Sequence, residues 1–239
     1  MSLLRHPLIA PAGLVGLSAA VVLVLAGVAI LVALVSGVAI SAILAWLVAQ
    51  RAERTIQRAV GARLAYAGEF PRLHNTVDGI CLTHGLERPA VYVVDSTSGN
   101  AMAMAGRGGT SMVLTTGAAD RVTLVELEAL VAHLLARCAG TTLRDETVAA
   151  ALGRFNIFGR RTSTGGPDRI VRADFDGSDL TRFPPGMQEL LRALSDIGAA
   201  VDAPFATARL WLLQPDGRTD VSTADHPAVD MRIAALAER

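Results

Sequence analysis

The pattern of charged and apolar residues divides the chain near residue 50. No Asp, Glu, Lys or Arg occurs between Arg5 and Arg51, and residues 14–49 are almost wholly Leu, Val, Ile, Ala and Gly. About 20 apolar residues span a bilayer, so this run is too long for one ordinary span and just sufficient for two. It also exceeds the apolar region of about 7 to 15 residues found in a secretory signal peptide. The pattern therefore predicts a transmembrane segment over residues 1–50.

We expect this segment to fold as a helical hairpin in the lipid bilayer. Candidate turns lie near Gly27 or at Ser36-Gly37, although no polar loop marks either place. One long tilted helix is the alternative. The rest of the chain, residues 51–239, is expected to form one domain.

Basic residues flank the apolar run unequally. Arg51, Arg54 and Arg58 follow it at once, whereas only Arg5 precedes it. Basic residues favour the cytoplasmic side of a membrane. We therefore expect a protein of the plasma membrane, with the bulk of the chain on the cytoplasmic side.

The composition agrees with a membrane protein and argues against one class of partner. Of 239 residues, 51% are hydrophobic and 18% are charged. All 22 basic residues are Arg, and the 21 that follow residue 50 nearly balance the 22 acidic residues. A nucleic-acid-binding domain carries a basic excess. Nucleic acid is therefore not an expected partner.

Helical and strand patterns alternate over residues 51–140. Apolar residues at helical spacing predict two helices over 51–86, the first continuing from the membrane and the second opened by Pro71. Short β-rich runs at 89–94, 100–105 and 110–116 suggest a small antiparallel sheet. Thr123 and Glu126 form a capping box, and Gly140 supplies a stop. These signals predict a helix over 123–139.

The last hundred residues are more polar. Residues 160–167 have the weakest pattern, and we expect a mobile loop there. Helices are expected near 169–181, 185–199 and 226–238, with a short apolar element around 206–213.

A possible degenerate metal motif lies on the helix predicted at 123–139. Residues 133–137 read His-Leu-Leu-Ala-Arg. In the zinc motif H-E-x-x-H, histidines at i and i+4 share one helix face and reach one metal ion, while the glutamate activates water. Here His133 remains, and Leu134 and Arg137 occupy the positions of the glutamate and the second histidine.

Several motifs in order give the chain a family resemblance. They are Pro71-Arg72-Leu73-His74-Asn75, Asn100-Ala101-Met102-Ala103, the segment from Glu126 to His133, Ala173-Asp174, and His226-Pro227 with Arg232-Ile233. In that order they resemble the HtpX-like membrane zinc metallopeptidases of the CAAX-prenyl endopeptidase clan. The resemblance covers nearly the whole chain. It implies an α+β fold, in which a transmembrane segment precedes a metallopeptidase-like domain with a small antiparallel sheet packed on helices.

The resemblance also implies which residues would hold zinc. The family's ligands and glutamate fall on His133, Leu134, Arg137 and, three residues before Ala173-Asp174, on Ile170. Leu and Ile offer no donor atom, and a protonated guanidinium cannot bind a metal. No intact catalytic residue and no metal site are therefore expected, and no cofactor, in contrast to the zinc of the family.

His133 and Arg137 each allow two interpretations. His133 is either a relic that hydrogen-bonds inside the fold or a ligand in an altered site. Arg137 either pairs with an acidic neighbour such as Asp174 or lies exposed in the cleft, since a buried Arg needs a partner. Leu134 and Ile170 are read as core fillers.

A rebuilt metal site would need other donors. Asp168 and Asp174 flank Ile170 but project from other helix faces, because one helical residue turns the direction by about 100°. His74, His84 and His226 are the remaining candidates.

Peptide binding could outlast the loss of zinc. In the family, Asn100 and Ala101 begin the edge strand where substrate is expected to lie as an added strand, and such pairing needs no metal. His226 and Arg232 resemble residues near the cleft. These four residues form a candidate peptide groove; the alternative is that the strand only completes the sheet.

The sequence thus favours a membrane-anchored, catalytically inactive metallopeptidase homologue, or pseudopeptidase. It would bind a protein or peptide, or serve as an accessory subunit of a larger membrane complex. The alternative is an active zinc-dependent membrane endopeptidase with an atypical metal site.

Overall fold

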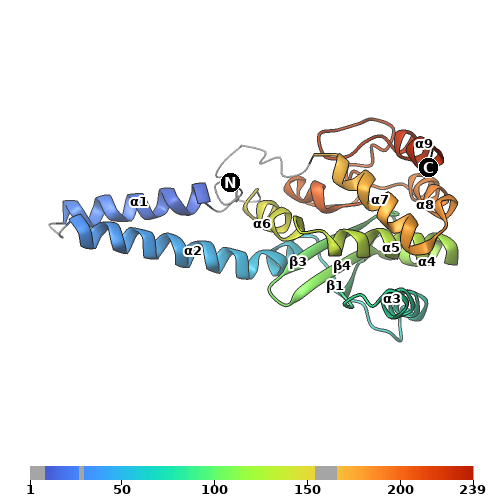
Figure 1. Ribbon diagram of the computed structural model, residues 1–239, viewed down its shortest axis with the longest axis horizontal. Coiled ribbons are helices and arrows are strands. Elements are labelled where there is room, and N and C mark those ends of the chain that lie inside the picture. The colour runs from blue at the N-terminus through green and yellow to red at the C-terminus, as the bar shows by residue number, and fades with distance from the viewer. Residues whose placement is uncertain (1–8, 27–29, 154–165, 239) are drawn as a thin grey trace.

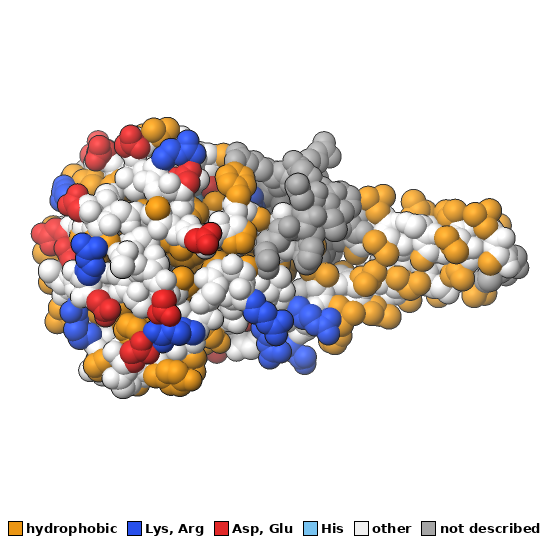
Figure 2. Space-filling model, turned by 180° about the vertical axis from the view of Figure 1, so that it is seen from behind, with side chains coloured by type: hydrophobic (Ala, Val, Ile, Leu, Met, Phe, Trp, Pro, Cys, Tyr) orange, Lys and Arg blue, Asp and Glu red, His pale blue; other side chains and the backbone are white. Residues whose placement is uncertain are grey.

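The computed structural model describes residues 9–26, 30–153 and 166–238, which form a two-helix projection attached to a globular part (Figure 1). The projection consists of α1 (Ile9–Leu25) and most of α2 (Ile30–Ala59). In the part of the chain described, α2 is the one helix long and apolar enough to cross a bilayer, and α1 is apolar but shorter. Apolar side chains cover the projection, and charged side chains are spread over the globular part (Figure 2). The chain therefore has a membrane-type helical segment at its N-terminal end.

α2 continues without a break from the projection into the globular part. Its apolar stretch ends near Gln50, but the helix runs on to Ala59, and Ile56 is fully buried in the domain core. The predicted boundary at residue 50 therefore lies inside one continuous helix.

The helices α1 and α2 lie side by side and touch through small residues (Figure 1). A Cβ placed on Gly37 would lie 2.5 Å from the carbonyl oxygen of Gly16 and 3.0 Å from Cβ of Ala20. A Cβ on Gly16 would likewise overlap the carbonyl oxygen of Gly37. Small residues four apart let helix backbones approach closely, which drives helix association in lipid.

This arrangement decides between the alternatives for the N-terminal segment. Because two helices pack together, the alternative of one long tilted helix is wrong. A turn at Ser36-Gly37 is also wrong, since both residues lie within α2, where Gly37 serves close packing. The other candidate turn, near Gly27, lies outside the described residues. The number of helices that cross the membrane stays a prediction.

The globular part is built on one small mixed sheet, and the predicted α+β class is confirmed. Its strands are β1 (Arg63–Leu64), β2 (Ala90–Val94), β3 (Ala101–Gly106) and β4 (Gly109–Thr115), in the order β1-β2-β4-β3. The pairs β1–β2 and β3–β4 are antiparallel, but β2 and β4 are parallel. The expected antiparallel sheet is therefore wrong for this pair. After β2, the connection at 95–100 reverses the chain direction and leaves a gap of one strand between β2 and β3. The next strand, β4, fills this gap and therefore runs parallel to β2.

Helices cover this sheet, and α5 is the central one. The helices are α3 (Pro71–His84), α4 (Thr116–Arg121), α5 (Leu124–Ala139), α6 (Leu143–Gly153), α7 (Asp168–Thr181), α8 (Pro184–Ile197), the 3-10 helix η2 (Phe205–Leu210) and α9 (Val229–Ala237). α5 packs against α3, α7, α8 and the sheet. The domain core therefore surrounds the helix that carries His133.

Most of the predicted helices are confirmed. α5 has both hydrogen bonds of the capping box formed by Thr123 and Glu126. α7, α8 and α9 match the helices expected near 169–181, 185–199 and 226–238. The sequence pattern does not predict α6, because its buried positions include Glu146 and Thr147 among small residues. The expected mobile loop at 160–167 lies mostly outside the described residues.

The contact between α1 and α2 can be tested with matched glycine substitutions. Gly16→Ala should destabilise the packed pair by about 1–3 kcal/mol, because its methyl group would overlap the backbone of Gly37. Gly13→Ala is the control, since a Cβ there meets nothing within 4 Å. Thermal unfolding of the purified chain in detergent would measure both. Equal unfolding midpoints would contradict the close contact.

Candidate functional site

His133 lies at the centre of a buried polar cluster. Its Nδ1 is 2.9 Å from Oδ1 of Asp174 on α7. Arg232 of α9 donates to the same carboxylate from Nε and Nη2, each at 2.7 Å, and Nη1 donates to the Leu212 carbonyl at 3.0 Å. His133, Asp174 and Arg232 are each 1% exposed. We call these three residues the His133 cluster; it joins α5, α7 and α9.

A close approach of two helices brings this cluster together. A Cβ on Gly177 of α7 would lie 2.8 Å from the backbone nitrogen of His133. Asp174 lies one helical turn before Gly177, on the same face of α7. The absence of a side chain at Gly177 therefore lets Asp174 reach His133.

Burial and neighbouring charges set the protonation of the cluster. Burial lowers the pKa of His133, and the positive charge of Arg232 lowers it further, although the hydrogen bond to Asp174 opposes both. Burial alone would raise the pKa of Asp174, but Arg232 and His133 together bring it below its ordinary value. At neutral pH the cluster is thus a neutral imidazole donating from Nδ1 to a carboxylate, with Arg232 balancing its charge.

Arg137 belongs to a second buried cluster, which we call the Glu146 cluster. Nη2 of Arg137 donates to Oε2 of Glu146 on α6 at 2.8 Å. Nε of Arg169 on α7 lies 3.4 Å from the same oxygen, and its Nη2 lies 3.6 Å from Oδ1 of Asp225. Thr142 donates to the other oxygen of Glu146 at 2.9 Å. Two guanidinium groups therefore share the buried carboxylate of Glu146.

Arg137 pairs with an acidic neighbour, as the first interpretation expected, but the partner is Glu146 and not Asp174. It does not pair with Asp174, whose oxygens are taken by His133 and Arg232. Nor is it an exposed cation in a cleft, because its side chain is 6% exposed and held by Glu146. The sequence reasoning missed Glu146 as partner. Its signal would have been helical spacing of Leu143, Glu146 and Ala150, which puts the carboxylate on a buried face.

At the other two positions where the family would have a metal ligand or the catalytic glutamate, this chain has the aliphatic side chains of Leu134 and Ile170. Leu134 is 1% exposed and Ile170 is fully buried. The core fillers expected from the sequence thus occupy interior positions. Among the described residues, no group of three or more His, Cys, Asp or Glu side chains is arranged to hold a metal ion. The residues present at the four family positions do not fit zinc.

The candidates for a rebuilt metal site are engaged elsewhere or exposed. Asp168 is exposed at the start of α7, and His84 is exposed in the last turn of α3. His74 Nε2 lies 2.9 Å from the Ala65 carbonyl, and its Nδ1 lies 2.7 Å from Arg88. The structure therefore brings only Asp174 of this set to His133.

The four residues of the candidate peptide groove lie in the interior. The side-chain amide of Asn100 donates to the carbonyls of Ala199 and Leu213, and the backbone amide of Leu212 donates to the carbonyl of Ala101 at 2.7 Å. This pairing covers the outer edge of β3 at its beginning. An added peptide strand could pair there only if residues 211–213 moved away, so the groove stays a prediction.

His226 occupies the interior beside the same segment. Its Nε2 is 2.8 Å from the Trp211 carbonyl, and its Nδ1 is buried without a hydrogen-bond partner among the described residues. Burial, with Arg232 and Arg169 nearby, lowers its pKa to about 4. It is therefore a neutral donor that fixes the 211–213 segment, which in turn covers β3.

Together these contacts connect helices and hold charges in fixed pairs. The histidine that a metallopeptidase would use as a ligand is bonded to Asp174, and the position of the water-activating glutamate is Leu134. The arrangement can support packing between α5, α6, α7 and α9.

Removal of the shared carboxylate tests the Glu146 cluster. Glu146→Gln should lower the free energy of unfolding by about 3–5 kcal/mol, because Arg137 and Arg169 would remain buried without their anion. Glu128→Gln makes the same chemical change at an exposed position of α5 and should change it by no more than about 0.5 kcal/mol. Urea unfolding in detergent would measure both. Similar losses in the two variants would contradict the buried pairing.

The buried His226 predicts a loss of stability in acid. Its pKa is about 4 in the folded chain against an ordinary value of 6.5, which corresponds to about 3 kcal/mol at about 1.4 kcal/mol per unit. Because folding favours the neutral form, this stability is full above pH 6.5 and is lost progressively as the pH falls toward 4. His226→Gln keeps a side-chain N–H group that can donate to the Trp211 carbonyl, but it removes the group that titrates. Unfolding free energies measured from pH 7 to pH 4 should therefore fall less steeply in the variant, and identical slopes would refute the assignment.

The amino-acid sequence is also similar to those of several named proteins. No family model matches the chain, and no solved structure matches it. Several proteins named Protease HtpX homolog match its sequence. The one from Dictyoglomus thermophilum is 27% identical, over 78% of this chain and 75% of its own length. The one from Thermodesulfovibrio yellowstonii is 29% identical, over 74% of this chain and 78% of its own.

A third relative, from Tropheryma whipplei (strain Twist), is also 29% identical, over 74% of this chain and 76% of its own length. The matches therefore extend over most of both proteins and are not confined to the apolar helices. Over most of its length the chain is therefore similar to proteins of the HtpX-like family.

Proposed function

We propose that this membrane-anchored member of the peptidase family is a pseudopeptidase. It acts by binding a protein or peptide, or as an accessory subunit of a membrane complex, and uses no zinc. The observation that carries the proposal is the joint replacement at three of the four family positions by Leu134, Arg137 and Ile170.

The donor chemistry at these positions supports the loss of metal binding. A catalytic zinc site takes three protein ligands with nitrogen, oxygen or sulfur donors. Leu134 and Ile170 supply only carbon, and they are packed in the interior. Arg137 adds a fixed positive charge one helical turn from His133, where it would repel a divalent cation.

The two buried clusters give the former site a structural role. His133 joins α5 to α7 through Asp174, and Arg137 joins α5 to α6 through Glu146. A metal ion in such a place would hold α5 and α7 together. Hydrogen-bonded ion pairs can do the same without a ligand set, provided that every buried charge has a partner.

The membrane segment supports anchoring with the domain in the cytoplasm. Apolar side chains such as Leu17, Val22 and Val38 are more than half exposed along the projection, where lipid would cover them. The arginines at residues 51, 54 and 58 lie just past the apolar stretch and favour the cytoplasmic side of the plasma membrane.

Of the two proposed roles, peptide binding and service as an accessory subunit, the second would use a surface that is more accessible in this structure. The candidate peptide groove is occupied by residues 211–213, as described above. The projection, in contrast, presents small and apolar side chains along its length, which are suited to packing against other transmembrane helices.

Metal content and proteolysis test the loss of catalysis. The full chain, purified from membranes without added metal, should contain much less than one zinc per molecule by elemental mass spectrometry. It should also show no chelator-sensitive cleavage of an unfolded substrate such as casein, because the donors and the general base are missing. His133→Ala should leave both results unchanged.

The alternative, an active enzyme with an atypical metal site, makes the opposite forecast. Stoichiometric zinc that disappears in His133→Ala, or chelator-sensitive cleavage lost in the same variant, would overturn the pseudopeptidase proposal.

A further inference from the structure

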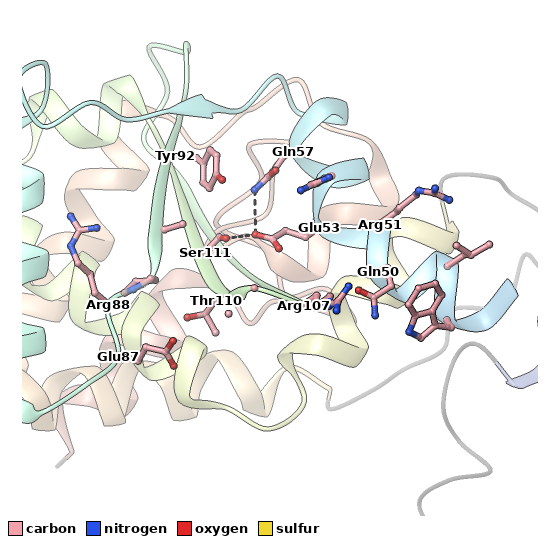
Figure 3. Close-up of a pocket in the computed structure, with 17 residues that line it drawn as sticks. Gln50, Arg51, Glu53, Gln57, Glu87, Arg88, Tyr92, Arg107, Thr110 and Ser111 are labelled. Carbon is pink, nitrogen blue, oxygen red and sulfur yellow. Dashed lines mark hydrogen bonds between the residues drawn. The ribbon is translucent and has the colours of Figure 1, made fainter. Parts of the chain in front are cut away.

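A cavity opens where α2 enters the globular part. It has a volume of about 810 Å³ and lies between α2, the residues before β2, and the hairpin that joins β3 to β4 (Figure 3). On α2, Trp46, Gln50 and Arg54 follow one another at intervals of four residues, so they line one face of the helix. The cavity therefore adjoins the end of the membrane segment.

Unpaired arginines line this cavity. Arg51, Arg54 and Arg107 are exposed and have no hydrogen bond or ion pair with another described residue. The fourth arginine, Arg88, is held by Asp78 and His74. Figure 2 shows basic side chains gathered where the projection joins the globular part. The cavity thus offers guanidinium groups that are free to bind an anion.

The two carboxylates of the lining do not cancel this charge. Glu53 points toward β4 and accepts hydrogen bonds from Ser111 and Gln57 (Figure 3). Gly106 leaves the room that Glu53 occupies, since a Cβ there would overlap the carboxylate. Glu87 lies on the far side of the cavity from Arg51. Arg88 is already paired with Asp78, but the three unpaired arginines still outnumber the two glutamates, so the lining keeps a net positive charge.

The cavity also has an apolar side that faces the membrane segment. Trp46 is 56% exposed and, with Leu47, forms the lining nearest to the apolar stretch of α2. Trp is enriched at the interface between lipid tails and water. Arg51 follows Trp46 by five residues, or about 7.5 Å along a helix, which places it at the depth of the headgroups. The lining therefore changes from apolar near Trp46 to charged at Arg51, as a phospholipid changes from its acyl chains to its headgroup.

We propose that this cavity binds the phosphate of an anionic phospholipid headgroup from the adjacent leaflet. Arg51, Arg54 and Arg107 contact the phosphate, whose oxygens match the planar fork of a guanidinium group. Trp46 and Leu47 contact the glycerol and upper acyl region. The inference depends on α2 crossing the membrane but not on the absence of catalysis.

The test compares two variants with the same loss of charge. The pocket variant carries Arg51→Gln, Arg54→Gln and Arg107→Gln. The control carries Arg58→Gln, Arg172→Gln and Arg192→Gln, at exposed residues outside the cavity lining. The full chain would be purified from nanodiscs of phosphatidylcholine with phosphatidylglycerol, and retained lipid counted by native mass spectrometry. Unfolding in phosphatidylcholine alone checks that both variants fold.

We expect phosphatidylglycerol to remain on the unmodified chain and on the control. Each headgroup contact from a basic residue is worth about fivefold in affinity, so the pocket variant should bind this lipid at least about tenfold more weakly. Equal retention by both variants would overturn the proposal, because general attraction to charge would then explain it. Inorganic phosphate, added to the chain in neutral detergent, should raise the unfolding temperature much less than the lipid does. An equal rise would overturn the lipid as the source of the phosphate.

Discussion

The fold depends on neutralising charges that are removed from water around α5. An unpaired buried ion costs several kcal/mol, whereas a hydrogen-bonded pair is close to neutral in its effect on stability. Asp174 and Glu146 are each nearly or fully buried, and each faces more than one positively charged or hydrogen-donating group. The partners of Asp174 lie on helices distant in sequence, whereas Glu146 pairs both with Arg137 of the preceding helix and with Arg169 of the next one. Satisfying these charges therefore fixes how α6, α7 and α9 are placed around α5.

The same constraint bears on the four positions where the HtpX-like resemblance would place zinc chemistry. A zinc ion would demand several anionic or neutral donors that converge on one point. Here the two buried carboxylates are paired with arginines instead, and the two clusters lie about one helical turn apart on α5, one around His133 and one around Arg137. Each cluster is close to neutral in total charge. A cation added between them would find both carboxylates already engaged in hydrogen bonds and ion pairs.

How far the sequence predicts this structure depends on the range of the interactions. Local signals succeed: the capping box at Thr123 predicts α5, and Pro71 predicts the start of α3. The parallel pairing of β2 with β4 is not visible, because it depends on where the connection at 95–100 places β3. α6 is missed for a related reason. Its buried Glu146 looks like a surface residue until Arg137 and Arg169 are known to meet it.

The candidate site shows the same limit. The positions of Leu134 and Ile170 in the interior follow from their apolar side chains. The partner of Arg137 cannot be inferred in this way, because Asp174 and Glu146 are both acidic and both close in sequence to predicted helices. The choice between them depends on Arg232, which comes from the C-terminal helix and is bonded to both oxygens of Asp174. Because α9 supplies this competing cation, the pairing around α5 depends also on the last element of the chain, and the helical spacing of residues 143–150 indicates only that Glu146 is buried, not which cation meets it.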